Sequence, residues 1–534
     1  MPRIAFAGLA FLGVLSAPLF AEQTCQGLRS LALDHATITS ATAVPEGPLS
    51  GGRGGPPVIA PAHCAVQGII RPTKDSEIHF ELWIPASGWN GKYLQLGNGG
   101  WAGAINAAGL AEPVRRGYAA AATDDGHQGG AGATWAIGHP EKLIDFGYRA
   151  VHETNLQSKA IIRDLFGRAP SRSYFNGCSD GGREALMEAQ RYAEDFDGII
   201  AGSPASDWSH LFTGFIWNAR ALTETPGSAI PLAKLSVIQK AVLAQCDAAD
   251  GVKDGLLQDP RACRFDPSVL TCKGAEGPEC LTAPQVEALR KIYDGPRNPR
   301  TGASIFPGYA RGTEAGPAGW SAWIAPASAT SSIQYGFGSS YYGQAVFEEP
   351  KWDYRTLNFD TDVAFGDRKA GPVLNATNPD LRSFRANGGK LIQYHGWGDP
   401  AISPLSSIAY YDSVRAFLDR FPDARHQAPG STQEFYRLFM VPGMGHCGGG
   451  VGANSFGNGA STQTDPDHDI ISALDRWVET GVAPDKIIAT GTVVGDTSKA
   501  LTRPLCPYPQ VARYDGTGDP DNAASFACAA PQVP

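Results

Sequence analysis

The segment "YFNGCSDGGREALMEAQRYAEDFDG", residues 174–198, places a serine in a tight, glycine-rich turn. Residues 177–181, GCSDG, fit the pattern G-x-S-x-G, in which the serine stands on a sharp turn between a strand and a helix. The small flanking residues let the backbone turn tightly enough to expose the hydroxyl of Ser179. The apolar residues before the turn and the helical spacing over 184–193 predict a strand followed by a helix.

The same alternation of strand and helix continues on both sides of this segment. Apolar runs that end in loops predict strands in "KYLQLGNGG", "GYAAAATDDGH", "DGIIAGSPA", "GGKLIQYHGWGD" and "EFYRLFMVPGMGH". Helical spacing predicts helices over 153–165, 404–418 and 469–478. This alternation is typical of a parallel sheet covered by helices, so we expect an α/β fold.

The alternation stops in the middle of the chain, where the sequence becomes rich in cysteine, glycine and aromatic residues. The simplest account is one α/β domain interrupted by an inserted lid, since 534 residues exceed a single small core. We therefore expect a signal peptide at 1–21, the first part of the α/β domain at 22–205, the lid at 206–376 and the second part at 377–534.

The composition is that of a globular protein, with 43% hydrophobic and 18% charged residues. The formal net charge is −9 and no basic run occurs, which argues against nucleic acid and anionic membranes as partners.

The amino terminus, "MPRIAFAGLAFLGVLSAPLFA", has a positive start and an apolar run that ends at Ala21. This pattern favours a cleaved signal peptide, and hence a secreted or periplasmic protein without a membrane partner once the peptide is removed. The alternative is an uncleaved anchor, for which the apolar run is at the lower limit of length.

Three residues, each at the end of a predicted strand, form a candidate catalytic triad. Ser179 follows "SYFN", Asp399 follows "KLIQYHGWG" and His446 follows "YRLFMVPGMG". A serine hydroxyl needs a base, and the base needs a carboxylate to orient it. In α/β-hydrolases these residues occur in the order serine, acid, histidine. Each residue alone could belong to an ordinary turn or loop, but the combination favours an α/β-hydrolase fold with a serine nucleophile.

An oxyanion hole requires two backbone N–H donors near the nucleophile. The amide of Asp180 is the first candidate, because it directly follows Ser179 at a helix start. The loop "GNGGW" supplies the second, from Gly100 or, as second choice, Gly99. The alternative is that this loop is only a tight turn.

The ten cysteines predict five disulfides in an oxidising compartment, although the sequence alone leaves their connectivity open. Proximity favours Cys246–Cys263, Cys272–Cys280 and Cys506–Cys528 as local loops and Cys25–Cys64 near the amino terminus, which leaves Cys178 and Cys447. These last two adjoin Ser179 and His446, so their pairing would bring the nucleophile beside its base. The alternative is a metal site that uses His446 and Cys447, but no Cys/His spacing elsewhere supplies further ligands.

A second candidate site lies in "CDAADGVKDGLLQD", where Asp247, Asp250 and Asp254 fall within eight residues. Closely spaced oxygen ligands suit calcium, but the spacing is not that of an EF-hand. A solvated acidic loop is the equal alternative.

The motifs "GCSDGG", "HGWGDP", "GMGHC" and "WVETGVAPDKI" together resemble the tannase and feruloyl esterase family over nearly the whole chain after residue 21. The resemblance implies an α/β-hydrolase core with a large lid, esterase activity and the disulfide Cys178–Cys447. It also implies a structural Ca²⁺ in the lid, held by the side chains of Asp247, Asp250 and Asp254 and the carbonyls of Val252 and Leu256. Asp180 departs from the family, since many relatives carry threonine there, and this leaves the fine specificity open.

The aromatic residues of the predicted lid suggest the kind of substrate. Trp320 and Trp323 in "GWSAWIAP" and His395 near Asp399 are expected to line the substrate site, where flat rings suit an aromatic acyl group. The function that we predict is a secreted serine esterase acting on a small ester of an aromatic carboxylic acid. The alternatives are a tannase or terephthalate-monoester hydrolase of the same family, or a catalytically idle binding protein.

Overall fold

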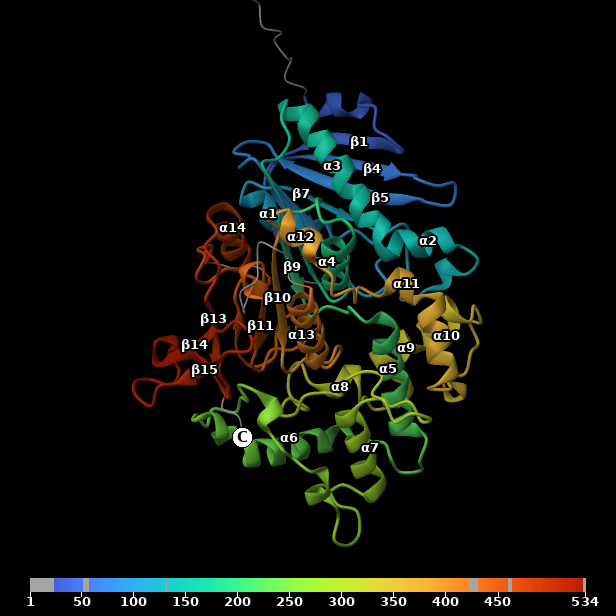
Figure 1. Ribbon diagram of the computed structural model, residues 1–534, viewed down its shortest axis with the longest axis vertical. Coiled ribbons are helices and arrows are strands. Elements are labelled where there is room, and N and C mark those ends of the chain that lie inside the picture. The colour runs from blue at the N-terminus through green and yellow to red at the C-terminus, as the bar shows by residue number, and fades with distance from the viewer. Residues whose placement is uncertain (1–23, 51–56, 131, 422–430, 460–462, 532–534) are drawn as a thin grey trace, which may run out of the picture.

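The computed structural model describes residues 24–50, 57–130, 132–421, 431–459 and 463–531 (Figure 1). The predicted signal peptide, residues 1–21, lies outside the described residues. Within them, no helix is both long and apolar enough to cross a membrane.

A mixed sheet of nine strands forms the centre of the described structure, in the order β1-β4-β5-β7-β6-β8-β9-β10-β11. The strands are β1 (Ala36–Val44), β4 (His63–Ile70), β5 (Ile78–Pro85), β6 (Lys92–Leu96), β7 (Ala119–Thr123), β8 (Arg172–Cys178), β9 (Gly198–Gly202), β10 (Lys390–Gly396) and β11 (Tyr436–Val441). Neighbouring strands from β7 to β11 are parallel, whereas β1, β4 and β5 pair in antiparallel fashion. The predicted α/β-hydrolase class is confirmed. The antiparallel strands β1, β4 and β5 are an addition to the predicted parallel sheet.

Helices cover both faces of this sheet because its inner strands are apolar on both sides. The helices around it are α1 (Ala107–Arg115), α2 (Pro140–Ile144), α3 (Ala150–Phe166), α4 (Asp180–Arg191), α12 (Arg382–Ala386), α13 (Pro404–Arg420) and α14 (Ile470–Thr480). Successive residues of β8 show the division: Phe175 is buried with residues of α3, α4 and α13, and Tyr174 with residues of α14.

Between β9 and β10 the described chain adds no strand to the central sheet. It forms helices instead, namely α5 (Trp208–Thr223), α6 (Leu232–Cys246), α7 (Ala283–Asp294), α8 (Trp320–Trp323), α9 (Ile333–Ser340), α10 (Thr361–Lys369) and α11 (Gly371–Leu374). These helices lie beyond one end of the sheet (Figure 1). One apolar cluster consists of residues of the insertion alone, and a second also includes Trp101, Phe146 and Ile402 from outside it. The insertion therefore has a core of its own and shares another with the rest of the fold.

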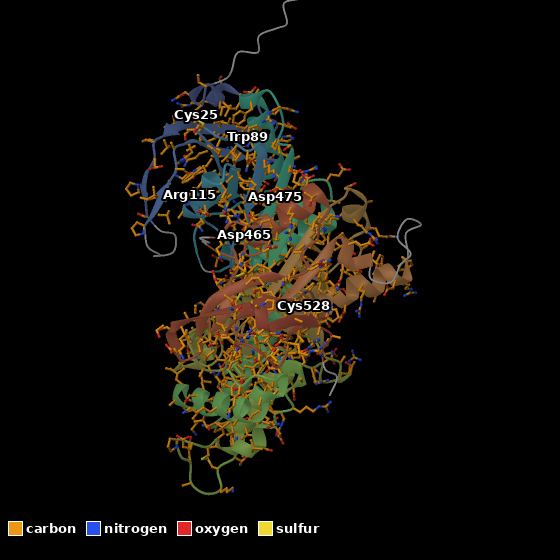
Figure 2. All side chains as sticks on the ribbon, turned by 90° about the vertical axis from the view of Figure 1, so that its left-hand side faces the viewer. Cys25, Trp89, Arg115, Asp465, Asp475 and Cys528 are labelled. Carbon is orange, nitrogen blue, oxygen red and sulfur yellow. A yellow bond between two sulfur atoms is a disulfide. The ribbon has the colours of Figure 1, made fainter. Side chains whose placement is uncertain are left out.

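Three small antiparallel sheets complete the described structure. The strands are β2 (Gly47–Leu49) with β3 (Val58–Ala60), β12 (Gly452–Ser455) with β13 (Ile487–Val493) and β14 (Asp496–Leu505), and β15 (Val511–Tyr514) with β16 (Phe526–Ala529). Figure 2 shows Cys25 at one end of the molecule and Cys528 near its middle, above the green segments of the insertion. A disulfide joins Cys528 to Cys506 and so ties the last strand to the end of β14.

Candidate active site

Ser179 stands on the turn between β8 and α4. Its backbone has φ +67° and ψ −118°, a conformation that residues other than glycine rarely adopt and that is typical of functional turns. A Cβ atom on residue 177 would lie 2.4 Å from the carbonyl oxygen of Gly181, and one on residue 182 would lie 2.3 Å from that of Gly202. The glycines of this motif are therefore required because strand and helix approach each other too closely for a side chain.

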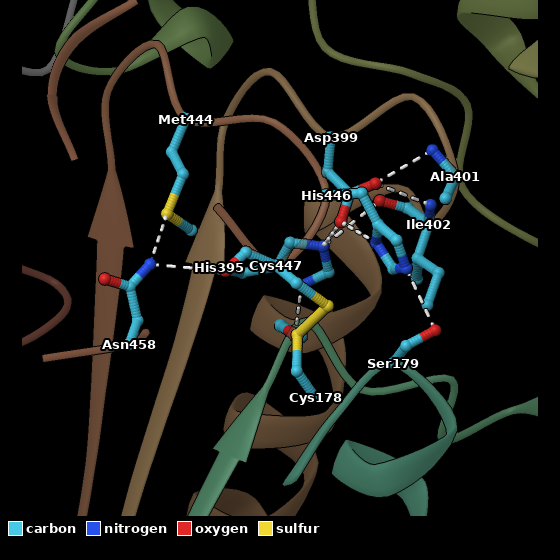
Figure 3. The surroundings of a disulfide bond; sticks show 11 residues. Cys178, Ser179, His395, Asp399, Ala401, Ile402, Met444, His446, Cys447 and Asn458 are labelled. Atoms are coloured by element: carbon cyan, nitrogen blue, oxygen red, sulfur yellow. Dashed lines mark hydrogen bonds and ion pairs between the residues drawn. A yellow bond between two sulfur atoms is a disulfide. The ribbon is translucent and has the colours of Figure 1, made fainter. Parts of the chain in front are cut away.

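Ser179, His446 and Asp399 form one hydrogen-bonded chain (Figure 3). The Oγ atom of Ser179 lies 2.9 Å from His446 Nε2, and His446 Nδ1 lies 2.8 Å from Asp399 Oδ2. Both contacts are satisfied when Nδ1 carries the proton, because Nε2 can then accept the serine hydroxyl proton. Ser179 and His446 are partly exposed and Asp399 is buried, so the hydroxyl is reachable from solvent while the carboxylate is shielded.

Asp399 is held ionised by its surroundings. Burial alone would raise the pKa of this carboxyl, but His446 and His395 together lower it below its usual range. The backbone amides of Ala401 and Ile402 donate to Asp399 Oδ1 at 2.8 and 2.9 Å. A buried carboxylate with this many donors stays charged and can orient the histidine.

His395 was expected to line the substrate site, and the structure contradicts this. Its side chain is fully buried, with Nε2 at 3.2 Å from Asp399 Oδ2 and Nδ1 at 2.7 Å from Ser407 Oγ. The residue lies on β10 and points into the molecule, so it positions Asp399 and has no surface to offer a ligand. The spacing of four residues between His395 and Asp399 brings them close in sequence, but it does not show that both side chains are buried together.

Cys178 and Cys447 form a disulfide directly beside the hydrogen-bonded chain (Figure 3). Their Cα atoms are 5.9 Å apart, within the usual range for such a bond. The other cysteines pair as Cys25–Cys64, Cys246–Cys263, Cys272–Cys280 and Cys506–Cys528. Because Cys447 has no free thiol, it cannot be a metal ligand together with His446.

The fold and this geometry agree with comparisons to known proteins. The sequence matches the family described as tannase and feruloyl esterase over residues 64–529. The chain belongs to the tannase and feruloyl esterase family. It is accordingly a carboxylic ester hydrolase, which decides against the idle binding protein.

Relatives of this chain include esterases of bacteria and fungi. An uncharacterized esterase of Xanthomonas campestris pv. campestris is 44% identical, over 98% of this chain and 94% of that protein. The mono(2-hydroxyethyl) terephthalate hydrolase of Piscinibacter sakaiensis is 33% identical, over 96% and 93%. Among solved structures, feruloyl esterase B of Aspergillus oryzae matches with a TM-score of 0.84 and 28% identity, over 95% of this chain and 100% of that one.

The two candidate oxyanion donors of this family member lie on neighbouring segments. Asp180 is the first residue of α4, and the carbonyl of Asn98 accepts a hydrogen bond from Gly181 N–H at 2.9 Å. This contact sets the loop with Gly99 and Gly100 against the first turn of the helix.

Two aromatic residues of the insertion lie next to His446. The ring centroids of Trp323 and His446 are 5.3 Å apart, and the ring of Phe337 is nearly parallel to that of Trp323 at 6.2 Å. Phe337 also lies 3.2 Å from where a Cβ atom on Gly100 would be. Both rings are partly exposed, as is Ser179.

Trp320 was also expected to contact substrate, and here the structure again differs. Its side chain is 2% exposed and packs edge-on against Tyr293 and Tyr309 inside the lid. The residue begins a single-turn helix whose far end presents Trp323, so only one of the two tryptophans reaches the active site.

The acidic loop of this family member lies at the end of α6, where the disulfide Cys246–Cys263 closes it. Asp247 accepts hydrogen bonds from the amide of Gly255, and Asp250 accepts them from those of Val252 and Gln258. Burial, together with the neighbouring carboxylates of Asp254 and Asp247, raises the pKa of Asp250 to about 6, although its backbone donors lower it.

The loop therefore holds more negative than positive charge. Arg503 pairs with Asp254 at 2.8 Å, and Arg261 pairs with Asp259 at 2.6 Å further along the loop. The carboxylates of Asp247 and Asp250 are stabilised only by backbone donors. Carboxylate and carbonyl oxygens are the kind of ligand that calcium prefers.

Proposed function

We propose that this protein is a serine esterase that uses Ser179 as nucleophile, His446 as general base and acid, and Asp399 to orient His446. Ser179 Oγ attacks the ester carbonyl and passes its proton to His446 Nε2, which then protonates the leaving alcohol. Water, activated by the same histidine, hydrolyses the acyl-enzyme and releases the acid. The amides of Asp180 and Gly100 stabilise the oxyanion in both steps.

The observation that carries this proposal is the continuous chain from Ser179 Oγ through His446 to Asp399 Oδ2, with both contacts below 3 Å. Ser179 lies 267 residues before His446 in the sequence, and Asp399 lies 47 residues before it. Their convergence supports a catalytic arrangement, because a structural role would not require a serine in a strained conformation beside a histidine.

For the substrate, we propose an ester of an aromatic carboxylic acid. Trp323 and Phe337 offer two flat surfaces next to His446 and Gly100, and each aromatic contact favours a flat acyl group by about 0.5–1.5 kcal/mol. Relatives described as feruloyl esterases and as a mono(2-hydroxyethyl) terephthalate hydrolase support the same class.

A panel of esters tests this assignment. We expect kcat/KM for methyl ferulate, methyl gallate or mono(2-hydroxyethyl) terephthalate to exceed that for methyl butyrate by about 5- to 150-fold, the factor that corresponds to two aromatic contacts. The order within the panel identifies the acyl group. Equal or higher kcat/KM on the butyrate ester would refute the aromatic preference and leave a general carboxylesterase.

We further propose that the chain is exported after cleavage of residues 1–21, that residues 206–376 act as the lid, and that the loop of Asp247, Asp250 and Asp254 holds a structural calcium ion. Five disulfides support an oxidising location. A bound calcium would supply charge neutralisation to the loop, and no catalytic step involves it.

A further inference from the structure

Directly behind Ser179 lies a buried cluster of three carboxyl groups. Asp125, at the end of β7, and Asp180 and Glu184, on α4, are at most 2% exposed, and an oxygen of each lies within 4.8 Å of the others. One cation accompanies them: Arg183 Nε lies 2.5 Å from Asp180 Oδ1, and its other nitrogens donate to the carbonyls of residues 146 and 147. Three acids thus face a single guanidinium.

This cluster is connected to the candidate oxyanion loop through Asn98. The backbone N–H of Asn98 donates to Glu184 Oε2 at 3.0 Å, and its side-chain Nδ2 donates to Asp125 Oδ2 at 2.8 Å and to the carbonyl of Thr123 at 2.9 Å. Its carbonyl accepts from Gly181 N–H at 2.9 Å. The backbone N–H, the carbonyl and the side-chain Nδ2 of Asn98 are therefore held by α4 and by the end of β7.

The loop and the helix also touch through their backbones. A Cβ atom on Gly97 would lie 2.7 Å from the Cα of Gly181 and 2.8 Å from Glu184 Oε2, and one on Gly181 would lie 2.8 Å from the carbonyl oxygen of Asn98. With no side chains between them, the distance from the Gly99–Gly100 amides to the Asp180 amide depends directly on where Asn98 is held.

The charges show how the cluster is kept together. Asp125 Oδ1, Asp180 Oδ2 and Glu184 Oε1 are buried and have no donor among the described residues. Burial raises the pKa of Glu184 well above its ordinary value and that of Asp125 to about 7, and Glu188 one turn further on adds another nearby carboxyl. A protonated carboxyl can donate a hydrogen bond to a neighbouring carboxylate. Carboxyl groups of the cluster that stay protonated therefore supply donors for these oxygens.

We propose that Glu184 and Asp125 form a positioning pair that holds Asn98, and through it the Gly99–Gly100 amides, at the spacing from the Asp180 amide that an oxyanion requires. Glu184 acts in its protonated form, accepting from Asn98 N–H with Oε2 and donating from Oε1 within the cluster. The inference rests on the proposed function, in which these amides bind the tetrahedral intermediate.

Substitutions at Glu184 and Asn98 test the pair. Glu184→Gln keeps an oxygen for Asn98 N–H and replaces the acid proton by an amide donor, so we expect kcat to stay within about threefold of the native enzyme. Glu184→Leu has no acceptor for Asn98 N–H, and we expect kcat to fall about 10- to 100-fold. This loss is no larger than the one expected when a whole oxyanion donor is removed. KM should change less than threefold, since Trp323 and Phe337 are untouched.

Asn98→Ala provides a second variant if Glu184→Leu does not fold, because it removes the contact with Asp125 at a partly exposed position. We expect a similar loss of kcat. In all three variants, affinity for an aryl boronic acid, which places a negative oxygen in the oxyanion site, should fall in proportion to kcat, while affinity for the free aromatic acid should not.

The positioning role would be overturned if Glu184→Leu and Asn98→Ala kept kcat within threefold of the native enzyme, or if Glu184→Gln were as impaired as Glu184→Leu. A failure of the proposed function looks different. In that case a fluorophosphonate would not label Ser179 in the native enzyme, whereas here we expect stoichiometric labelling of Ser179 in every variant.

Discussion

At the scale of single residues, the role that we propose for Ser179 depends on its neighbours. Its left-handed backbone conformation aims the hydroxyl at His446, and the glycines beside it allow strand and helix to meet. Asp399 in turn depends on His395, a buried neighbour that fixes the second oxygen of the carboxylate. Each group is effective only because the next one is held in place.

We expect Ser179→Ala to lower kcat by more than 1000-fold without changing the thermal midpoint, because triad members act as a unit. Hydrolysis of an aryl ester and a thermal melt check this. Ser455→Ala, at an exposed serine on β12, is the matched control and should keep full activity. Retention of a tenth of the native rate in Ser179→Ala would exclude Ser179 as nucleophile.

Trp323 is expected to contribute to acyl specificity. Trp323→Ala should lower the ratio of kcat/KM for methyl ferulate over methyl butyrate by about three- to tenfold, the value of one aromatic contact. The control is Trp89→Phe, at a tryptophan that stacks on Phe166 and, within the described structure, has no hydrogen bond or ring contact with the triad. An unchanged ratio in Trp323→Ala would show that the lid ring does not touch the acyl group.

At the scale of elements, the site depends on how strands and helices are joined. The disulfide Cys178–Cys447 links the end of β8 to the loop after β11, so it fixes two catalytic loops relative to each other. On the other side of the triad, Tyr309 of the lid donates to the carbonyl of Ala401 at 3.0 Å, next to Asp399. The loops that carry the triad are thus fastened both to the sheet and to the lid.

Replacing Cys178 and Cys447 together by alanine should lower both the free energy of unfolding and kcat. The two effects can be measured independently. The sequence separation of 269 residues predicts a loss of roughly 5 kcal/mol in unfolding free energy. At a temperature where circular dichroism shows the variant still folded, kcat should remain at least about tenfold reduced, because Ser179 and His446 lose their shared anchor. The Cys272→Ala/Cys280→Ala variant, which opens a local loop, should keep native kcat; a full native rate in the first variant would refute the positioning role.

His210 on α5 makes the stability of the lid depend on pH. Burial would lower its pKa, but Asp207 at 2.9 Å and Asp367 of α10 at 3.1 Å raise it to about 10. Because the folded pKa exceeds the unfolded value, the contribution is complete below about pH 6.5 and is lost as pH rises toward 10.

We therefore expect His210→Gln to lower the unfolding free energy by about 2 kcal/mol at pH 6, and this difference to shrink as the pH approaches 10. Denaturant titrations at several pH values measure it. Ser209→Ala also removes a hydrogen bond to Asp367, but its effect should not vary over this range. A difference for His210→Gln that stays constant from pH 6 to 10 would contradict the assignment.

At the scale of the whole molecule, the insertion and the carboxy-terminal strands are connected through the acidic loop. Arg503 of β14 is buried and pairs with Asp254 in the loop after α6. The loop is thus placed where it can join two parts of the chain that are far apart in sequence.

Chelation tests the calcium that we propose for this loop. Excess EDTA should lower the thermal midpoint, because a ligand that binds only the folded state stabilises it. Activity measured at low temperature before unfolding should persist, and Asp250→Asn should lose the response to EDTA. An immediate loss of turnover on chelation at low temperature would contradict a purely structural ion.

The local sequence was sufficient for the elements around the triad. The glycine motif around Ser179 requires a strand, a tight turn and a helix, and apolar runs before Asp399 and His446 specify strands because both faces of those strands are buried. The even number of cysteines and their spacing likewise limited the pairings. These features depend on interactions between near neighbours, which the sequence contains directly.

Only the tertiary structure decided which residues meet. Sequence spacing could not show that His395 and Trp320 are buried while Trp323 borders His446, because burial depends on what packs over a residue from distant segments. Nor could it connect Asn98 with Asp125 and Glu184, which come from three separate segments of the chain. The antiparallel strands before β6 were missed for the same reason: strand pairing is an interaction between segments, and it is determined by the folded chain as a whole.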